Sequence, residues 1–390
     1  MAIFNWPEAA FSIKTFADLH VVFFAISIAH AANCSSSGGE YNNSGGACTV
    51  PPGPGAGRIT ATGSGAITAN GVTVDVPFGT AAIAQNGGSI LFGIDPAAGN
   101  SKIVERFSGA GGLIGLFATG GGSQISATGL VVNLPGSGNI MAEAANGALI
   151  DLESGTSISI QSGGGSQVLL ATGTSSRITA NNITISGSTG GGDFGVHSTL
   201  GASIALADSS VTLSSPGGGL TGILAENGSS LTASGTTINI SASGNNVAVK
   251  SASGSTVQLS GGSVTMTGTS GETALMAQGA ALSANDVAIG VTGGQSSAGT
   301  VQNGGTMSIS GGSVSATGSG SVGFFVNGSA GVANSLTRQY DREFNGGLLP
   351  RARRECEHQV DWHDRRRQQR CAVEHAGAVG HYIRRGTIYT

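Results

Sequence analysis

The sequence is poor in charged residues, aromatic residues and proline. Only 10% of its 390 residues are charged and 5% are aromatic, yet the mean hydropathy is slightly positive at +0.16. A charge-rich disordered segment and a membrane bundle are therefore both excluded. The 9 prolines and the lack of a three-residue glycine phase exclude collagen.

Glycine is abundant instead, with 68 residues. Average usage is about 7%, so a glycine share this high excludes an ordinary helical protein. The apolar character comes mainly from small side chains, which pack into narrow interiors, while serine and threonine are frequent between them. This composition favours a β-rich repeat protein.

A short signature recurs between residues 58 and 334, in which two apolar residues flank one small residue. Its instances begin at Val72, Val132, Ile158, Ile183, Val211, Ile238, Val264, Val287 and Val314. From Val132 onward the steps are 23 to 28 residues. Self-similarity with a period of about 20 to 50 residues indicates a solenoid, in which no single unit can bury its apolar face alone.

Each unit carries two further apolar clusters, separated by a glycine- and serine-rich loop and by a turn that is often Asn-Gly, as at Asn227-Gly228. Three short strands and no segment long enough for a helix predict an all-β fold, a right-handed parallel β-helix of about 26-residue coils with three strands per coil. Asn-Gly is also a hairpin signal, but the near-constant step argues against an antiparallel sandwich.

The first 31 residues are predicted to be a signal peptide. Residues 21–29 form an apolar run too short to span a bilayer, and Ala29-His30-Ala31 provides an A-x-A cleavage site. The preceding region is unusual, because its one lysine is outnumbered by two acidic residues. A buried N-terminal strand is the alternative.

Residues 32–57 are predicted to be a disulfide-capped N-terminal segment. Cys34 and Cys48 lie 14 positions apart, and an exported chain favours a disulfide between them. Closing a loop of this size contributes about 3 kcal/mol on the chain-entropy estimate. Lipidation of Cys34 is the rival interpretation, although Asn33 fits a lipobox poorly.

The predicted signal, the Cys34 to Cys48 cap and tandem units such as residues 222–240 resemble autotransporter passenger domains of the pertactin-like β-helix kind. The resemblance covers residues 32–334. It implies export to the periplasm and passage to the cell surface through an outer-membrane β-barrel translocator, and its members include adhesins, toxins and enzymes. No series of alternating ten-residue strands follows residue 334, so we expect that barrel to be absent from this chain. The expected location is the outer membrane or cell surface for an intact protein, and otherwise the periplasm or medium.

Residues 335–390 differ in composition from the rest. They contain 11 basic and 7 acidic residues, against 6 and 14 in residues 1–334, and serine is absent after Ser335. One interpretation is a basic tail that binds nucleic acid or an anionic surface. We favour the other, a frameshift that ends the repeat and leaves an out-of-frame, disordered tail.

Few residue patterns point to catalysis or metal binding. Five residues of the tail, Cys356, His358, His363, Cys371 and His375, lack the paired spacing of a zinc site. Asn43-Ser44-Gly45-Gly46 resembles a serine-protease loop only faintly and lacks a credible histidine partner. Asp151 and Glu153 are two apart, hence on one face of a strand, and a solvated pair explains them. The calcium-binding nonapeptide is missing.

These observations predict no enzyme activity, no cofactor, no metal and no nucleic-acid partner. The expected function is that of a non-catalytic passenger, an adhesin that binds an extracellular-matrix or cell-surface ligand. A β-helix glycan-active enzyme and a truncated passenger without function remain the alternatives.

Overall fold

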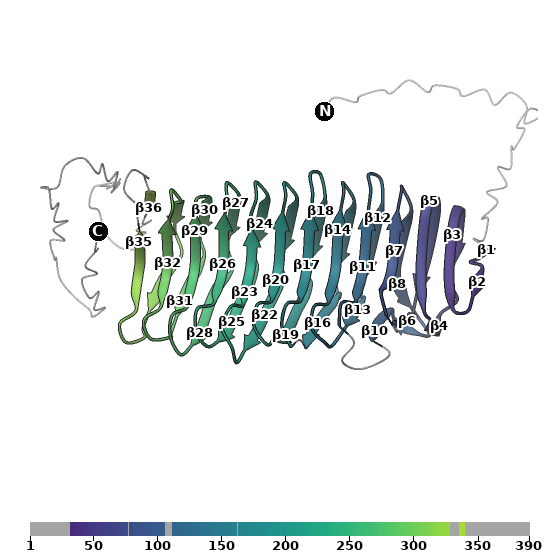
Figure 1. The fold of residues 1–390 in the computed structure, drawn as a ribbon, viewed down its shortest axis with the longest axis horizontal. Coiled ribbons are helices and arrows are strands. Elements are labelled where there is room, and N and C mark those ends of the chain that lie inside the picture. The colour runs from purple at the N-terminus through teal and green to yellow at the C-terminus, as the bar shows by residue number, and fades with distance from the viewer. Residues whose placement is uncertain (1–31, 77, 106–110, 162, 328–334, 340–390) are drawn as a thin grey trace, which may run out of the picture. The chain divides into compact units, whose positions relative to one another are not determined.

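The computed structural model describes residues 32–76, 78–105, 111–161, 163–327 and 335–339. The predicted signal peptide and residues 340–390 of the predicted tail lie outside this range. The described residues form 36 β-strands and no helix. They build a parallel β-solenoid of about 10 turns with three strands per turn and coils about 26 residues apart, which confirms the predicted fold class (Figure 1).

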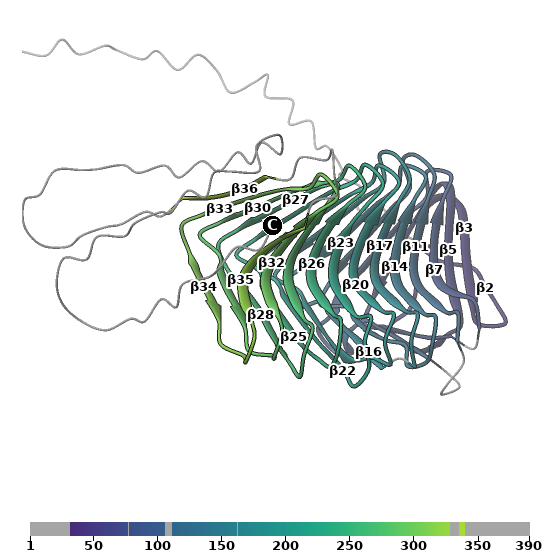
Figure 2. The same cartoon turned by 60° about the vertical axis from the view of Figure 1, so that its left-hand side comes forward.

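Three parallel ladders form the faces of the solenoid, and the chain visits them in the order A, B, C in each turn. Ladder A contains β7 (Thr80–Gln85), β11 (Ile114–Thr119), β14 (Ile140–Ala145), β17 (Gln167–Thr172), β20 (Phe194–Thr199), β23 (Thr221–Ala225), β26 (Val247–Ala252), β29 (Thr273–Gln278), β32 (Ser297–Gln302) and β35 (Val322–Asn327). Its strands lie side by side in Figure 2.

Ladder B follows each strand of ladder A after a short turn. It contains β8 (Ser89–Asp95), β12 (Gln124–Thr128), β15 (Leu149–Glu153), β18 (Arg177–Asn181), β21 (Ser203–Ala207), β24 (Ser230–Ser234), β27 (Thr256–Ser260), β30 (Ala281–Asn285), β33 (Thr306–Ser310) and β36 (Ser335–Gln339).

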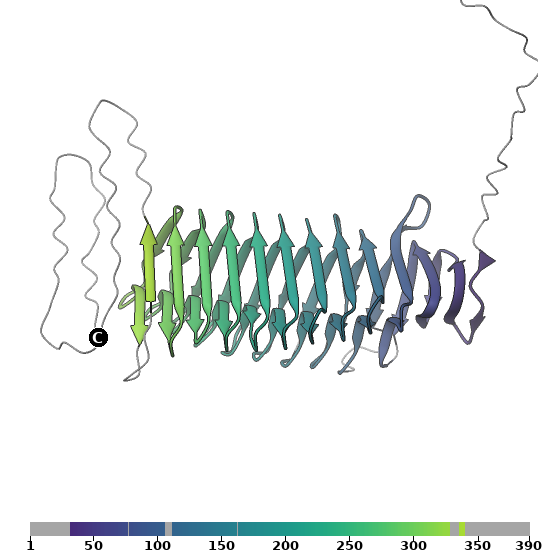
Figure 3. The same ribbon diagram turned by 90° about the horizontal axis from the view of Figure 1, so that it is seen from above.

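Ladder C is a separate 11-stranded sheet. It contains β4 (Gly53–Ala56), β6 (Val72–Val76), β10 (Lys102–Glu105), β13 (Val131–Asn133), β16 (Ser157–Gln161), β19 (Thr184–Ser188), β22 (Ser210–Ser215), β25 (Thr237–Ala242), β28 (Ser263–Gly268), β31 (Ala288–Val291) and β34 (Ser313–Ala316). Seen from above, the coils follow one another in sequence order (Figure 3).

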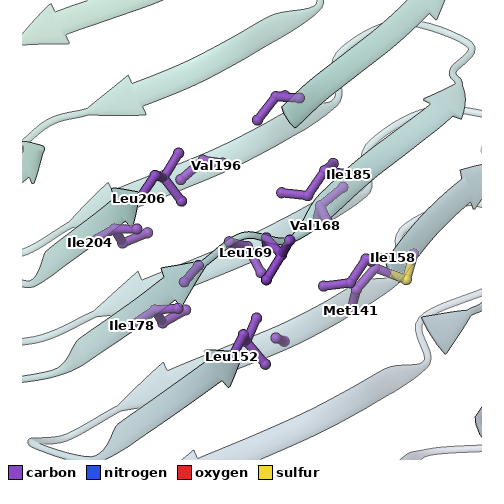
Figure 4. Packing of buried hydrophobic residues seen from close by; sticks show 14 of the residues in the cluster. Met141, Leu152, Ile158, Val168, Leu169, Ile178, Ile185, Val196, Ile204 and Leu206 are labelled. Atoms are coloured by element: carbon purple, nitrogen blue, oxygen red, sulfur yellow. The ribbon is translucent and has the colours of Figure 1, made fainter. Parts of the chain in front are cut away.

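The core lies between the three ladders and is made of stacked apolar rows. In β21, Ile204 and Leu206 point inward and are buried, and they pair in register with Ile178 and Ala180 of the preceding coil (Figure 4). Burying an isoleucine or leucine contributes about 1.5–3 kcal/mol. Each residue obtains this burial from its neighbouring coils, so the coils stabilise one another.

The register differs from the sequence alignment at three coils. The sequence repeat begins at Val72, Ile183 and Val287 in these coils. Strand pairing in ladder C instead aligns the residue two positions later with the start of the signature in the neighbouring coils, namely Val74, Ile185 and Ile289. Side chains alternate with a period of two, so a shift of two residues keeps the same face inward. The sequence pattern could not distinguish these alignments, and hydrogen-bonded pairing with the next coil does.

Asn-Gly pairs form turns between ladders A and B rather than hairpins. Asn146 and Gly147 connect β14 to β15, and both have positive φ, 54° and 83°. Asparagine and glycine adopt this conformation more readily than other residues. The same turn therefore redirects the chain to the next face of the coil, where the strands pair with other coils and not with each other.

The stack extends beyond both boundaries expected for the repeat. At the N-terminal end, β3 (Glu40–Thr49) pairs in parallel with β5 (Arg58–Asn70), which in turn pairs with β7 and β8. Short strands β1 (Ala32–Asn33) and β2 (Ser36–Ser37) lie against β3, and β9 (Gly99–Asn100) lies against β8. Cys34 and Cys48 are joined by a disulfide. At the other end, β36 pairs with β33.

Candidate functional site

Ladder C has an outer face lined by hydroxyl and amide side chains. One outer row contains Ser186, Thr212, Asn239 and Thr265, which pair in register on β19, β22, β25 and β28. Parallel pairing places registered side chains on the same side, and neighbouring strands lie about 4.8 Å apart. These side chains therefore form a regular array along the solenoid.

Two adjoining shallow hollows lie over this array. One has a volume of about 420 Å³ and is lined by residues of β19, β22, β25 and β28, among them Thr212, Leu213 and Asn239. The other, of about 430 Å³, lies over β16 and β19. Ser186 and Gly187 line both hollows, which together form one continuous groove that we name the ladder C groove.

Gly187 lies where the two hollows meet. It pairs in register with Ile160 on one side and Leu213 on the other, both large and apolar. A Cβ at position 187 would collide with the carbonyl oxygen and a methyl group of Ile160. The absence of a side chain thus lets two coils approach closely.

A second polar cluster surrounds His197 on the outer face of ladder A. Its Nδ1 lies 2.8 Å from Oε1 of Gln167, and its Nε2 lies 3.1 Å from Oε1 of Glu226. The ring of Phe194 stacks on the imidazole with a centroid distance of 4.9 Å. No motif in the sequence singles out His197. Its partners are 30 and 29 residues away in the chain, so no local pattern could have shown the cluster.

Burial lowers the pKa of His197 below its ordinary value of 6.5, while the hydrogen bond and charge of Glu226 oppose this shift. A neutral imidazole has one N–H donor and one acceptor nitrogen. It can donate to Glu226 and accept from Gln167 only if the amide nitrogen of Gln167, rather than its oxygen, faces Nδ1. The imidazole is therefore held by hydrogen bonds on both sides, and burial favours its uncharged form. Among the described residues the ring contacts Gln167, Glu226 and Phe194, and none of these supplies a hydroxyl nucleophile.

The predicted carboxylate pair lies elsewhere, on ladder B. Asp151 and Glu153 point outward from β15 on either side of buried Leu152, as their spacing indicated. Thr179 of the next coil donates a hydrogen bond to Asp151. The neighbours in register with Glu153 include Thr128, so hydroxyl side chains flank the pair.

Buried polar side chains also line the corner between ladders C and A. Oδ1 of Asn139 accepts a hydrogen bond from the Leu113 amide at 2.8 Å, and its Nδ2 donates to the carbonyls of Leu134 and Pro135 at 3.1 Å. Glu272 occupies the corresponding corner of a later coil and accepts hydrogen bonds from backbone amides and from Ser296. These side chains satisfy buried backbone groups, which is a structural role.

Two groups of residues were considered for a metal site and for a serine-protease loop, and the structure describes part of them. In the described ranges no group of three His, Cys, Asp or Glu residues could hold a metal ion. The five tail residues considered as a zinc site lie outside those ranges. Asn43 is part of strand β3, where its side chain donates hydrogen bonds to the carbonyls of Gly46 and Ala66, both at 3.0 Å.

Over the residues that the structure describes, no helix is long and apolar enough to cross a membrane. Comparison with known proteins adds no assignment: no family model, no curated protein and no solved structure matches the chain.

Proposed function

We propose that this chain is an exported, non-catalytic binding protein, an adhesin of the autotransporter-passenger kind displayed at the cell surface. The parallel solenoid of about 10 turns has the architecture expected for such a passenger.

The ladder C groove is the observation that carries the binding function. Hydroxyl and amide side chains both donate and accept hydrogen bonds, and here they repeat at every coil along Ser186, Thr212, Asn239 and Thr265. Leu213 and Ile240 lie beneath these side chains but belong to the buried core, so the polar row supplies the accessible groups of the groove. Such a surface suits a ligand whose own hydroxyl groups repeat along an extended chain, and we propose a cell-surface or matrix polysaccharide.

The binding proposal is tested with the full chain on an array of purified polysaccharides and matrix proteins. We expect binding to at least one polysaccharide. The variant Thr212→Ala/Asn239→Ala/Thr265→Ala should weaken that binding at least about tenfold, because each lost hydrogen bond is worth about 0.5–1.5 kcal/mol.

A matched variant on ladder B serves as the control. Thr232→Ala/Gln258→Ala/Ser283→Ala removes three outward polar groups from β24, β27 and β30 at the equivalent row. It should bind as the wild type does. Equal binding by both variants, or the absence of any polysaccharide binding, would contradict the assignment of the groove.

Export is tested separately by mass spectrometry of the chain recovered from a Gram-negative host. A mature N-terminus at Ala32 in the periplasm or medium is the expected result. An uncut chain that retains Met1 and stays in the cytoplasm would contradict export.

A further inference from the structure

The outer face of ladder A differs in chemistry from the other two faces. Its central outer row consists, in coil order, of Ile83, Phe117, Glu143, Leu170, His197, Leu224, Lys250, Met276, Thr300 and Phe325. Six of the ten are aliphatic, aromatic or methionine side chains. The equivalent rows of ladders B and C contain mostly serine, threonine, asparagine and glutamine.

The register shows that this row lies outside the core. Leu170 pairs with Glu143 and His197, and Leu224 pairs with Lys250, and registered residues of a parallel ladder project on the same side. Leu170 and Leu224 are absent from the core cluster that holds the residues before and after them. Leu170 and Leu224 are only 8% and 4% exposed, whereas Ile83, Phe117 and Met276 of the same row are half-buried and supply the accessible apolar surface of this face.

In the central outer row, residues one or two coils away on the two sides of His197 are either alike or opposite in charge. One coil away on either side lie Leu170 and Leu224, and two coils away lie Glu143 and Lys250. Within the described part of the chain, no ion pair or hydrogen bond connects Glu143 or Lys250 to another side chain. Burial raises the pKa of Glu143, as expected for a half-buried carboxyl without a cationic neighbour.

We propose that ladder A is the interface of an isologous dimer of this chain, in which two copies pack face to face with antiparallel solenoid axes. The two-fold axis runs along the strand direction at the level of β20. Each Glu143 then faces Lys250 of the second copy, and Leu170 faces Leu224. In a two-fold interface a surface must complement itself, and this arrangement pairs the opposite charges twice.

Residues farther from the axis fit the same arrangement. Three coils from β20, Phe117 faces Met276 of the second copy, and methionine sulfur packs favourably against aromatic rings. In the outer row at the start of the strands, Ile140 and Val247 both lie two coils from Phe194 and face each other. These two pairs thus bring apolar positions of the two copies together, whereas Ile83 faces Thr300 and Ile114 faces Thr273.

The area available is that of a stable dimer. The nine strands from β7 to β32 are centred on β20, and at strand spacings of about 4.8 Å and strand lengths of about 20 Å they cover about 800 Å². Two copies together then bury about 1,600 Å², which is the usual size of a specific interface. The outer rows of ladders B and C, which are polar, remain free, so the dimer leaves the ladder C groove open. This inference does not depend on the adhesin proposal.

Sedimentation equilibrium of the full chain at pH 7.5 tests the dimer with charge reversals. We expect dimerisation at concentrations up to about 100 µM. Glu143→Lys and Lys250→Glu should each weaken dimerisation at least about tenfold, because each places like charges opposite one another. The double variant Glu143→Lys/Lys250→Glu should restore it, which a folding defect could not do.

Lys102→Glu is the matched control, since Lys102 is an exposed outward lysine on ladder C. It should dimerise as the wild type does. A chain that stays monomeric up to about 100 µM, or a dimer insensitive to both reversals, overturns the proposal. Monomers that bind phosphatidylcholine vesicles, with the binding lost in Phe117→Ser, would overturn it too and assign the face to a lipid surface.

Discussion

At the scale of single residues, position 187 shows how one side chain shapes a surface. Gly187 occupies a place in ladder C that the coils before and after fill with Ile160 and Leu213. Its φ is not in the left-handed region, so glycine is required there by space and not by backbone conformation. The close approach of the Ile160 carbonyl oxygen is the reason that position 187 requires glycine.

We therefore expect Gly187→Val to lower the free energy of unfolding by about 1–3 kcal/mol, because the added side chain forces the backbone of two coils apart. Gly290→Ser is the control, since Gly290 lies on β31 of the same ladder with open space around its Cα and no positive φ. Urea unfolding followed by circular dichroism measures both. Equal stability of the two variants would contradict the packing argument.

His197 predicts a pH dependence. Its pKa is lowered in the folded state, so the unfolded chain binds more protons as the pH falls below the ordinary value near 6.5. The stability that the neutral ring contributes is present above that value and is lost as the pH falls through the folded-state pKa. Wild type should therefore lose more thermal stability between pH 7 and pH 5 than His197→Asn does. Identical losses measured by scanning calorimetry would exclude His197 as the titrating group.

At the scale of strands and corners, the loop from ladder C to ladder A is held by buried side chains rather than by strand pairing. Asn139 is fully buried and makes three hydrogen bonds to backbone groups of its own and the preceding coil. Aspartate, asparagine, glutamate and serine occupy equivalent corners in later coils. The loops vary in sequence because different polar side chains can satisfy the same backbone groups.

Asn139→Ala should destabilise the protein by about 1–3 kcal/mol, because it leaves the buried amide of Leu113 without an acceptor. Hydrogen exchange at Leu113 and Ile114 should accelerate. Asn133→Ala, at an exposed position on β13, should leave both stability and exchange unchanged. Slow exchange at Leu113 in the Asn139→Ala variant would mean that another group accepts this hydrogen bond.

At the scale of the whole molecule, each coil is stabilised by its neighbours, so the coils at the two ends of the stack have a neighbouring coil on one side only. At one end β1 pairs with β3, and a disulfide joins Cys34, the residue after β1, to Cys48 of β3. At the other end the last strand of ladder B, β36, pairs Leu336 with Met307 and Arg338 with Ile309. All preceding strands of ladder B have an apolar residue at the position of Ile309. The repeat pattern therefore changes within β36.

The frameshift hypothesis predicts that resequencing the gene from codon 325 onward reveals another frame in which this position is apolar and units of about 26 residues continue. A strand-rich barrel farther along that frame would support the autotransporter proposal. If the present frame is confirmed and the other frames contain no repeat, the tail is genuine and the frameshift hypothesis is wrong.

The sequence by itself determined the all-β solenoid, its coil length and its three strands per coil. A stacked fold repeats the same contacts in every coil, so the period of Val211, Ile238 and Val264 records the three-dimensional neighbours directly. Only the tertiary structure decided the register at Ile185 and the groove at Gly187. The same holds for His197 and its partners and for the apolar face of ladder A. These features depend on which residues of different coils lie side by side, and a pattern with a period of two fits several such alignments equally well.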